Sequence, residues 1–282
     1  IYTASFVGSS DVYKRQLHMF SIIKSGINAA TKDLAVISNN LANSSTNGFK
    51  RSNAEFEDMY HSQHNNSTVV ARGMGVNSIK PRQSFSQGSL QQTNGSLDLA
   101  IMGEGFFILG EPVGKESANP EFKYTRDGSF QMDRLGNIVN TDGLPVLGTG
   151  NAPINIPVNL LSDSGDILVI SEIKVSQSGQ VEATYGLDTT IVAGQIKLAD
   201  FVNEHGLKNI GNASFAETAE SGVPIVASPK ESSLGTLLPG SLEKSNTDVT
   251  DELVTMLRTQ HAFSGCSKLL QTDVDVVRRL LG

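Results

Sequence analysis

The sequence predicts an α+β protein in which paired N- and C-terminal coiled-coil helices accompany a central antiparallel β domain. Apolar residues recur with heptad spacing near both ends of the chain, and short alternating apolar segments separated by turn residues fill the middle. The chain has 282 residues, of which 38% are hydrophobic. This is enough apolar material for a buried core.

The N-terminal helix is predicted from Met19 to about Asn43, because its apolar residues are separated by four and three positions in turn. This spacing gives the narrow stripe of a coiled coil rather than the broad face of a helix on a globular domain. The pair Asn47 and Gly48 then ends the helix, and we expect Gly48 to adopt a positive φ before Phe49. The stripe consists of Ile23, Ile27, Ala30, Leu34, Ile37 and Leu41.

The C-terminal helix is predicted from Asp248 to Leu281, a length of 34 residues or about 50 Å. Thr247 or Asp248 can cap its first turn, and Arg278 and Arg279 in its last turn suit the helix dipole. Its apolar stripe again follows spacings of four and three. The stripe consists of Val249, Leu253, Met256, Gln260, Phe263, Ser267, Leu270, Val274, Val277 and Leu281.

Two interpretations of these stripes are open. In the first, each helix packs on the globular domain of its own chain. In the second, which the 3.5-residue period favours, each helix needs a helix as its partner, and the opposite end of the same chain is the simplest one. Gly26, Gln260 and Ser267 weaken the stripes, so a lone pair of these helices would be marginally stable and would need neighbours.

The chain divides into four predicted parts. Residues 1–18 lack an initiator Met and a signal-peptide pattern, and residues 10–16 resemble translated sequencing adapter. We therefore expect a non-native or disordered leader over 1–18, with Met19 as the candidate start. A terminal helical domain is expected over 19–45 and 247–282, an extended connector over 46–80, and a β-rich domain with a return strap over 81–246.

The central region contains apolar segments with the two-residue alternation of strands. Residues 97–101 alternate, and residues 106–109 continue after two glycines. Apolar residues of equal parity flank Asp127 and Gly128, which predicts a hairpin with its turn there. Further strands are expected at residues 138–139, 144–147, 167–170, 173–175, 181–185 and 191–201, which indicates an antiparallel sandwich or barrel-like domain.

Charge and residue usage exclude several classes of protein. The 22 basic and 29 acidic residues give a net charge of −7, so the chain has no general attraction to nucleic-acid phosphates. Cys266 is the single cysteine and cannot form an intrachain disulfide or a zinc cluster. His61 and His64 lack a third ligand nearby. The longest apolar runs are far shorter than the roughly 20 residues that span a bilayer.

No catalytic, cofactor-binding or metal-binding residue is predicted. Asp98, Glu104, Asp127 and Asp133 could supply the carboxylate pair of a glycoside hydrolase. Two of them, Asp127 and Asp133, lie in turn sequences that favour Asp for backbone reasons. The sequence has no nucleophile elbow and no phosphate-binding loop.

Motifs at both ends and in the middle of the chain closely resemble those of bacterial flagellar rod and hook proteins, over essentially Met19 to Leu281. The N-terminal motif reads Asn39-Asn40-Leu41-Ala42-Asn43 and then Thr46-Asn47-Gly48-Phe49-Lys50. Further matching residues are Phe56-Glu57-Asp58-Met59, Gln87-Gly88, Thr93, Leu97-Asp98, Ala100-Ile101, Gly105-Phe106-Phe107, Tyr124-Thr125-Arg126-Asp127-Gly128-Ser129-Phe130, Gly136, Gly240, Leu242-Glu243, Ser245-Asn246, Glu252-Leu253-Val254, Met256, Gln260, Ser267-Lys268 and Gln271-Thr272.

The resemblance implies a structural subunit of the basal-body rod, whose terminal helices form the inner tube of an axial polymer that transmits torque from motor to hook. It implies no enzymatic activity, no cofactor and export by the flagellar type III apparatus without a cleaved signal peptide. The implied partners are further copies of the chain, other rod and hook subunits, the surrounding basal-body ring proteins and the export apparatus. The implied polymer interface is Ile23, Ile27, Leu34, Ile37, Leu41, Leu253, Met256, Phe263, Leu270, Val274, Val277 and Leu281, and the turn motif is Asn43, Asn47, Gly48 and Phe49.

Other members of the family and proteins outside it are alternatives to a rod protein. Hook proteins usually insert a further β domain where this chain runs on from Leu147 to Ile167, which favours a rod protein. Within the rod proteins the distal type is the better match, with a proximal rod protein or a short hook as alternatives. Outside the family, the competing hypothesis is a secreted β-domain enzyme or adhesin with helical arms.

Overall fold

The computed structural model describes residues 3–65, 68–111, 121–161, 167–186, 189–231 and 234–281. They form an α+β fold, with a helix at each end of the chain and strands between them. The chain divides into two compact units. Unit 1 comprises Ile1–Ala42, Ser52–Ser84 and Thr247–Gly282, and unit 2 comprises Asn43–Arg51 and Phe85–Asn246.

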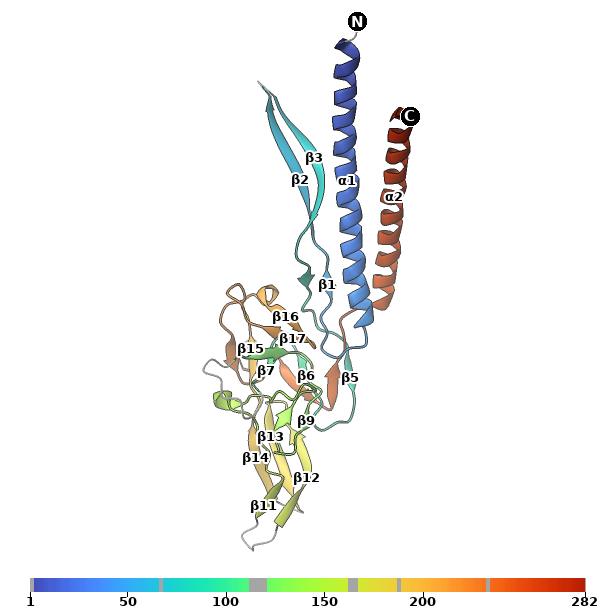
Figure 1. Ribbon diagram of the computed structural model, residues 1–282. Coiled ribbons are helices and arrows are strands. Elements are labelled where there is room, and N and C mark those ends of the chain that lie inside the picture. Colours follow the sequence, from blue (N-terminus) through green and yellow to red (C-terminus); the bar gives the residue numbers. More distant parts are fainter. Residues whose placement is uncertain are drawn as a thin grey trace. The chain divides into compact units, whose positions relative to one another are not determined.

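Unit 1 contains the two helices, which lie side by side in Figure 1. Helix α1 spans Thr3–Ala42 and helix α2 spans Val249–Leu281. The predicted cap of α2 is confirmed, since Asp248 Oδ1 accepts a hydrogen bond from the Thr250 backbone amide at 2.8 Å. Neither helix has, within its described part, an apolar stretch long enough to cross a membrane.

Helix α1 begins at Thr3, within the segment that we expected to be a non-native or disordered leader. Its helical backbone continues from there through Met19 to Ala42, and no proline interrupts this stretch. The origin of residues 1–18 stays a prediction.

Unit 1 also contains a long antiparallel hairpin of β2 (Phe56–Asn65) and β3 (Thr68–Ser78). Two short strands, β1 (Ser52–Asn53) and β4 (Arg82–Gln83), pair below it. The paired hairpin lies within the segment 46–80 that we expected to be an extended connector. Strand β3 approaches α1 closely, because the Val76 amide donates to Ser25 Oγ at 3.2 Å and Gly75, at φ +100°, has no side chain to meet Ser25.

Unit 2 consists of antiparallel sheets joined by turns. The largest sheet has the order β16 (Lys208–Gly211), β17 (Ser214–Ala216), β8 (Lys123–Thr125), β7 (Phe106–Leu109), β15 (Leu198–Asp200) and β18 (Ile225–Ala227). A second sheet has the order β11 (Asn159–Leu161), β12 (Ile167–Val175), β13 (Gln180–Tyr185) and β14 (Thr189–Gln195). Three pairs complete the unit: β5 (Leu90–Gln92) with β20 (Ser241–Glu243), β6 (Leu99–Met102) with β19 (Thr236–Pro239), and β9 (Gln131–Met132) with β10 (Ile138–Val139).

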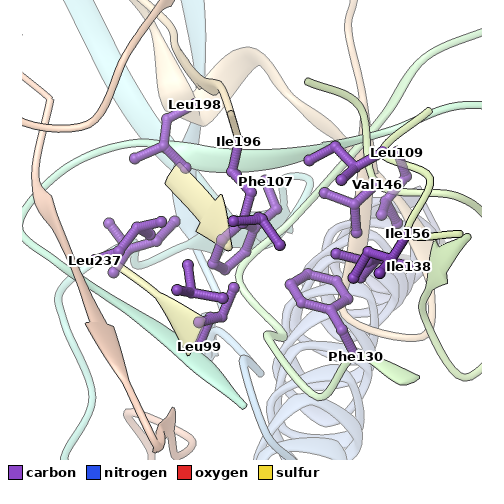
Figure 2. Packing of buried hydrophobic residues seen from close by; sticks show 14 of the residues in the cluster. Leu99, Phe107, Leu109, Phe130, Ile138, Val146, Ile156, Ile196, Leu198 and Leu237 are labelled. Atoms are coloured by element: carbon purple, nitrogen blue, oxygen red, sulfur yellow. The ribbon is translucent and has the colours of Figure 1, made fainter. Parts of the chain in front are cut away.

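Strand β7 is buried on both faces, which explains its uninterrupted apolar run. Phe107 and Leu109 point into one hydrophobic cluster with Leu198 and Leu99 (Figure 2). The alternate residue Phe106 belongs to a second, aromatic-rich cluster. Alternating side chains of one strand thus join the two parts of the core.

The predicted hairpin around Asp127 and Gly128 is wrong. Strand β8 pairs with β7 and β17, whereas β9 pairs with β10. The segment between them is held elsewhere: the Leu99 amide donates to the Gly128 carbonyl at 3.0 Å, and Asp127 Oδ1 accepts from the Ser129 amide at 3.1 Å. This side-chain turn carries the chain from one sheet to the next.

Candidate functional site

Helices α1 and α2 meet along a line of small and polar residues that recur every seven positions. Asn40 Nδ2 donates to Glu252 Oε1 at 3.1 Å, and Thr259 Oγ1 donates to Asp33 Oδ2 at 2.7 Å. Residue numbers rise along α1 as they fall along α2, so the two helices are antiparallel. We call the following three pairs the polar seam: Gly26 with Cys266, Asp33 with Thr259, and Asn40 with Glu252.

Close approach of the helices depends on the glycine of the polar seam. A Cβ atom added at Gly26 would lie 3.3 Å from Cys266 Sγ, so glycine leaves room for the thiol to pack between the helices. At the other end of the seam, Asn40 also binds the Ser52 backbone through both atoms of its amide, at 2.8 and 2.9 Å. The seam therefore joins α2, α1 and the start of β1.

The predicted apolar stripes and the observed polar seam are offset from each other at every second stripe position of each helix. There the observed contact lies one residue earlier, at Gly26 instead of Ile27 and at Glu252 instead of Leu253. Since one residue turns a helix by about 100°, the predicted apolar side chains at these positions, such as Ile27 and Leu253, lie beside the line of contact. Of the predicted interface residues, Ile23 and Ile37 are buried, Ile27, Leu34, Leu41, Met256, Leu270 and Val277 are half-buried, Leu253, Phe263 and Val274 are exposed, and the side chain of Leu281 lies outside the described residues.

The one-residue offset turns both stripes toward the same side of the helix pair, because the helices are antiparallel. Strand β3 covers the opposite side of α1, at Ser25. Leu253 remains 40% exposed and Val274 49% exposed on this side of α2, and Leu269 and Val276 are exposed to a similar degree elsewhere on the helix. We call this surface the apolar flank, and it comprises Ile27, Leu34, Leu41, Val249, Leu253 and Val274.

Unit 2 contains a buried cluster of three charged side chains. Lys50 Nζ lies 2.7 Å from Glu243 Oε1, and Arg126 Nη1 lies 3.5 Å from Glu243 Oε2. Arg126 also donates to the Gly103 carbonyl at 2.9 Å and stacks its guanidinium 5.1 Å above the Phe106 ring centre. A single carboxylate thus serves two buried cations.

Burial dominates the electrostatics of this cluster. Removal from water lowers the pKa of Lys50, and the nearby Glu243 carboxylate opposes this shift. Burial also lowers the pKa of Arg126, again against the pull of Glu243. Glu243 therefore stabilises the charged forms of both bases.

The turn residues lie in unit 2 near this cluster. Gly48 has φ +66°, as predicted, and its amide donates to the Glu243 carbonyl at 2.8 Å. Lys244 Nζ donates to Asn47 Oδ1 at 2.9 Å. Asn43 and Phe49 are half-buried.

Three of the four carboxylates considered for catalysis are hydrogen-bonded to nearby residues. Asp127 binds the Ser129 amide and hydroxyl, Asp133 Oδ1 accepts from the Arg134 amide at 2.6 Å, and Asp98 accepts from Thr93. Within the described residues, no group of three or more His, Cys, Asp or Glu side chains is arranged to hold a metal ion.

Sequence reasoning missed the ionic role of Lys50, Arg126 and Glu243. Lys50 and Glu243 are 193 positions apart, and a pair so distant leaves no local periodicity. The available signal was indirect: all three residues lie within the motifs that resemble rod and hook proteins.

The fold combines a helix pair that bears the exposed apolar flank with a β-rich unit. Models of flagellar protein families match three parts of the chain. The model described as Flagella basal body rod protein matches residues 23–50, the Flagellar hook protein FlgE/F/G D1 domain matches residues 100–183, and the Flagellar basal body rod FlgEFG protein C-terminal matches residues 238–281.

Individual relatives make the assignment more specific. The chain is 38% identical over 271 residues to the flagellar basal-body rod protein FlgG of Buchnera aphidicola subsp. Schizaphis graminum, covering 92% of this chain and 96% of the relative. It is 33% identical over 280 residues to FlgG of Bacillus subtilis, covering 93% and 97%. The hook protein FlgE of Escherichia coli is 24% identical over 410 residues, covering 93% and 99%. The chain therefore belongs to the flagellar basal-body rod and hook protein family.

Proposed function

We propose that this chain is a structural subunit of the rod of the bacterial flagellar basal body, and that it polymerises into the axial tube that transmits torque from motor to hook. The observation that carries the proposal is the similarity to FlgG proteins over more than nine-tenths of the chain. The match to a hook protein is weaker and extends over 410 residues, more than this chain contains. The family is structural rather than enzymatic.

The terminal helices are proposed to pair as a coiled coil within each subunit and to contact neighbouring subunits through the apolar flank. Two groups of residues with different surroundings support this proposal. Polar side chains join α1 to α2 within the chain, whereas large apolar side chains such as Leu253 and Val274 stay exposed. Contacts between copies would remove this apolar surface from water.

The proposed partners follow from the same assignment. Self-polymerisation and association with other flagellar subunits agree with the family. More specifically, we propose contacts with the neighbouring rod and hook subunits and with the basal-body rings around the rod. Delivery by the flagellar export apparatus without a cleaved signal peptide is proposed as well.

Two valines of α2 provide a matched test of the apolar flank. Val274 and Val276 are 49% and 45% exposed but are turned by about 200° from each other, so Val276 lies away from the flank. Val274→Glu should prevent incorporation into basal bodies, because it places a charge in a desolvated contact. Val276→Glu should be incorporated.

The measurement is electron microscopy and immunolabelling of basal bodies purified from a strain that carries only the variant gene, together with swimming in soft agar. Normal assembly of Val274→Glu would refute the role of the apolar flank. Absence of the wild-type chain from the rod of purified basal bodies would refute the proposed function itself.

A further inference from the structure

Unit 2 is connected to the rest of the chain through three segments, residues 43–51, 85–88 and 241–246. The carboxylate of Glu243, in the third segment, binds the other two. Its Oε1 atom accepts from Lys50 Nζ at 2.7 Å and from the Gly88 amide at 2.8 Å. The Glu243 backbone carbonyl adds a bond from the Gly48 amide at 2.8 Å.

Asn246, also in the third segment, likewise binds both of the other segments. Its Oδ1 atom accepts from the Arg51 amide at 2.8 Å, and its Nδ2 atom donates to the Ser86 carbonyl at 3.0 Å. Lys50 Nζ donates to the same Ser86 carbonyl at 2.9 Å. Each segment is therefore bonded to both of the others.

The charges at this point are removed from solvent. The side chains of Lys50 and Glu243 are fully buried, and that of Arg126 is 2% exposed. Removing one partner of a buried ion pair leaves a charge without compensation. Loss of Glu243 would leave two buried cations, whereas loss of Lys50 would leave Arg126 balanced by Glu243.

We infer that Glu243 is the positioning residue of a clamp, formed with Lys50 and Arg126, which couples the three segments that connect unit 2 to the helices and the hairpin. A change in one segment is transmitted to another through the Lys50–Glu243 ion pair, in which Lys50 also binds the Ser86 carbonyl of the second segment. That the clamp would carry mechanical load in a polymer rests on the proposed function, but the coupling itself is a property of the single chain.

The test perturbs one segment and measures another. Lys50→Met removes the ammonium in the first segment and keeps a side chain of similar length. Gly88, in the second segment, bonds to Glu243 and makes no bond to Lys50. We expect the Gly88 amide of the full-length monomer to exchange its hydrogen about tenfold faster in Lys50→Met than in the wild type, because the Glu243 carboxylate loses its nearest counter-charge and the second segment loses the bond from Lys50 to Ser86.

Lys244→Met is the matched control. It removes a bond of 2.9 Å between the third segment and Asn47 in the first, yet it leaves the Glu243 carboxylate untouched. In this variant the Gly88 amide hydrogen should exchange at the same rate as in the wild type. Equal Gly88 exchange in all three proteins, or equal acceleration by both substitutions, would overturn the inference.

Glu243→Gln adds a second measurement. It should accelerate exchange at Gly88 and Gly48 more than Lys50→Met does, because it leaves two cations without an anion. If Glu243→Gln does not fold, the comparison of Lys50→Met with Lys244→Met still decides. All of these measurements use monomer, so loss of the coupling would refute the clamp, while absence of the wild-type chain from the rod would refute only the proposed function.

Discussion

Gly48 is a position where both backbone conformation and packing require the absence of a side chain. Its φ is +66°, and an added Cβ atom would lie 2.4 Å from the Asp127 backbone nitrogen. Asn usually tolerates positive φ, but it carries the same Cβ atom. Strain and overlap therefore act together in any substitution.

We expect Gly48→Asn to lower the free energy of unfolding of the full chain by about 2–4 kcal/mol. Gly143→Asn is the control, because Gly143 also has positive φ but nothing lies within 4 Å of its added Cβ, and it should cost less than about 1 kcal/mol. Urea denaturation of the purified proteins measures both values. Equal losses of unfolding free energy in the two variants would show that the positive φ alone, without the contact to Asp127, causes the destabilisation.

Asp127 gives a prediction on pH dependence. Burial raises its pKa above the usual value, although its hydrogen bonds to Ser129 oppose the shift. The folded chain therefore binds this proton more tightly than the unfolded chain. The stability contributed by Asp127 decreases as pH rises from the unfolded pKa, about 3.9, through the folded pKa, and stays at the lower level above it.

Asp127→Asn removes this titration and keeps an oxygen that can accept from the Ser129 amide. Relative to wild type, the variant should gain stability between pH 4 and pH 7, and it should remain functional because Asp127 serves a turn. Urea denaturation at several pH values tests the first part, and swimming tests the second. A stability difference that shrinks from pH 4 to pH 7 would contradict the sign of the pKa shift.

Local residue patterns predict the conformation of Gly48 but not the contacts of Glu243. The positive φ of Gly48 could be predicted because an Asn-Gly pair after a helix is a local signal. The contacts of Glu243 could not, since its partners Lys50 and Gly88 are distant in sequence and come together only through the fold.

At the scale of elements, the period of the helices was predictable but the line of contact between them was not. Seven-residue spacing identifies a stripe, yet it does not tell which of two adjacent heptad positions faces the partner. Here small and hydrogen-bonding residues such as Gly26 and Thr259 occupy the contact. Some of the apolar residues that a pattern of hydrophobicity selects, such as Ile27 and Leu253, lie beside it, whereas Ile37 of the same pattern is buried. The prediction of a hairpin around Asp127 was wrong for a related reason, because equal parity of the flanking residues does not show which strands pair.

Thr259→Val tests the polar seam. It keeps the shape of the side chain but removes the hydroxyl that donates to Asp33 at 2.7 Å, which leaves a partly buried carboxylate without this bond. We expect a loss of about 1–3 kcal/mol in the stability of the helix pair, measured by helical circular dichroism on denaturation. Thr255→Val is the control, because Thr255 bonds only within its own helix at an exposed position, and it should change stability by less than about 0.5 kcal/mol.

At the scale of the whole molecule, the division into terminal helices and a central β region followed from the sequence. The assignment of residues 52–84 to the same compact unit as the helices did not, because their pairing as a hairpin and their contact with α1 depend on Gly75 and Ser25 coming together. The two units also differ in how they are stabilised. Unit 2 has two buried hydrophobic clusters. In the helices of unit 1, by contrast, Ile23, Ala30 and Ile37 are buried, polar bonds link α1 to α2, and Leu253 and Val274 stay exposed.

This difference predicts an order of stability in the dilute monomer. The helices bury only a few apolar side chains, keep others such as Leu253 in water and meet partly through polar bonds, so they gain less from their contact than strand β7, which is buried on both faces. Amides of α2 between Leu253 and Val277 should therefore exchange at least about a hundredfold faster than those of Phe107 and Ile108.

Assembly should reverse the order, because contacts between copies would bury the apolar flank. In purified rods we expect the α2 amides to become as slow as those of β7, while exchange in β7 changes little. Hydrogen exchange with mass spectrometry on monomer and on assembled rods measures both states. If α2 in the dilute monomer already exchanges as slowly as β7, the helix pair is stable by itself, and the apolar flank is not needed to complete it.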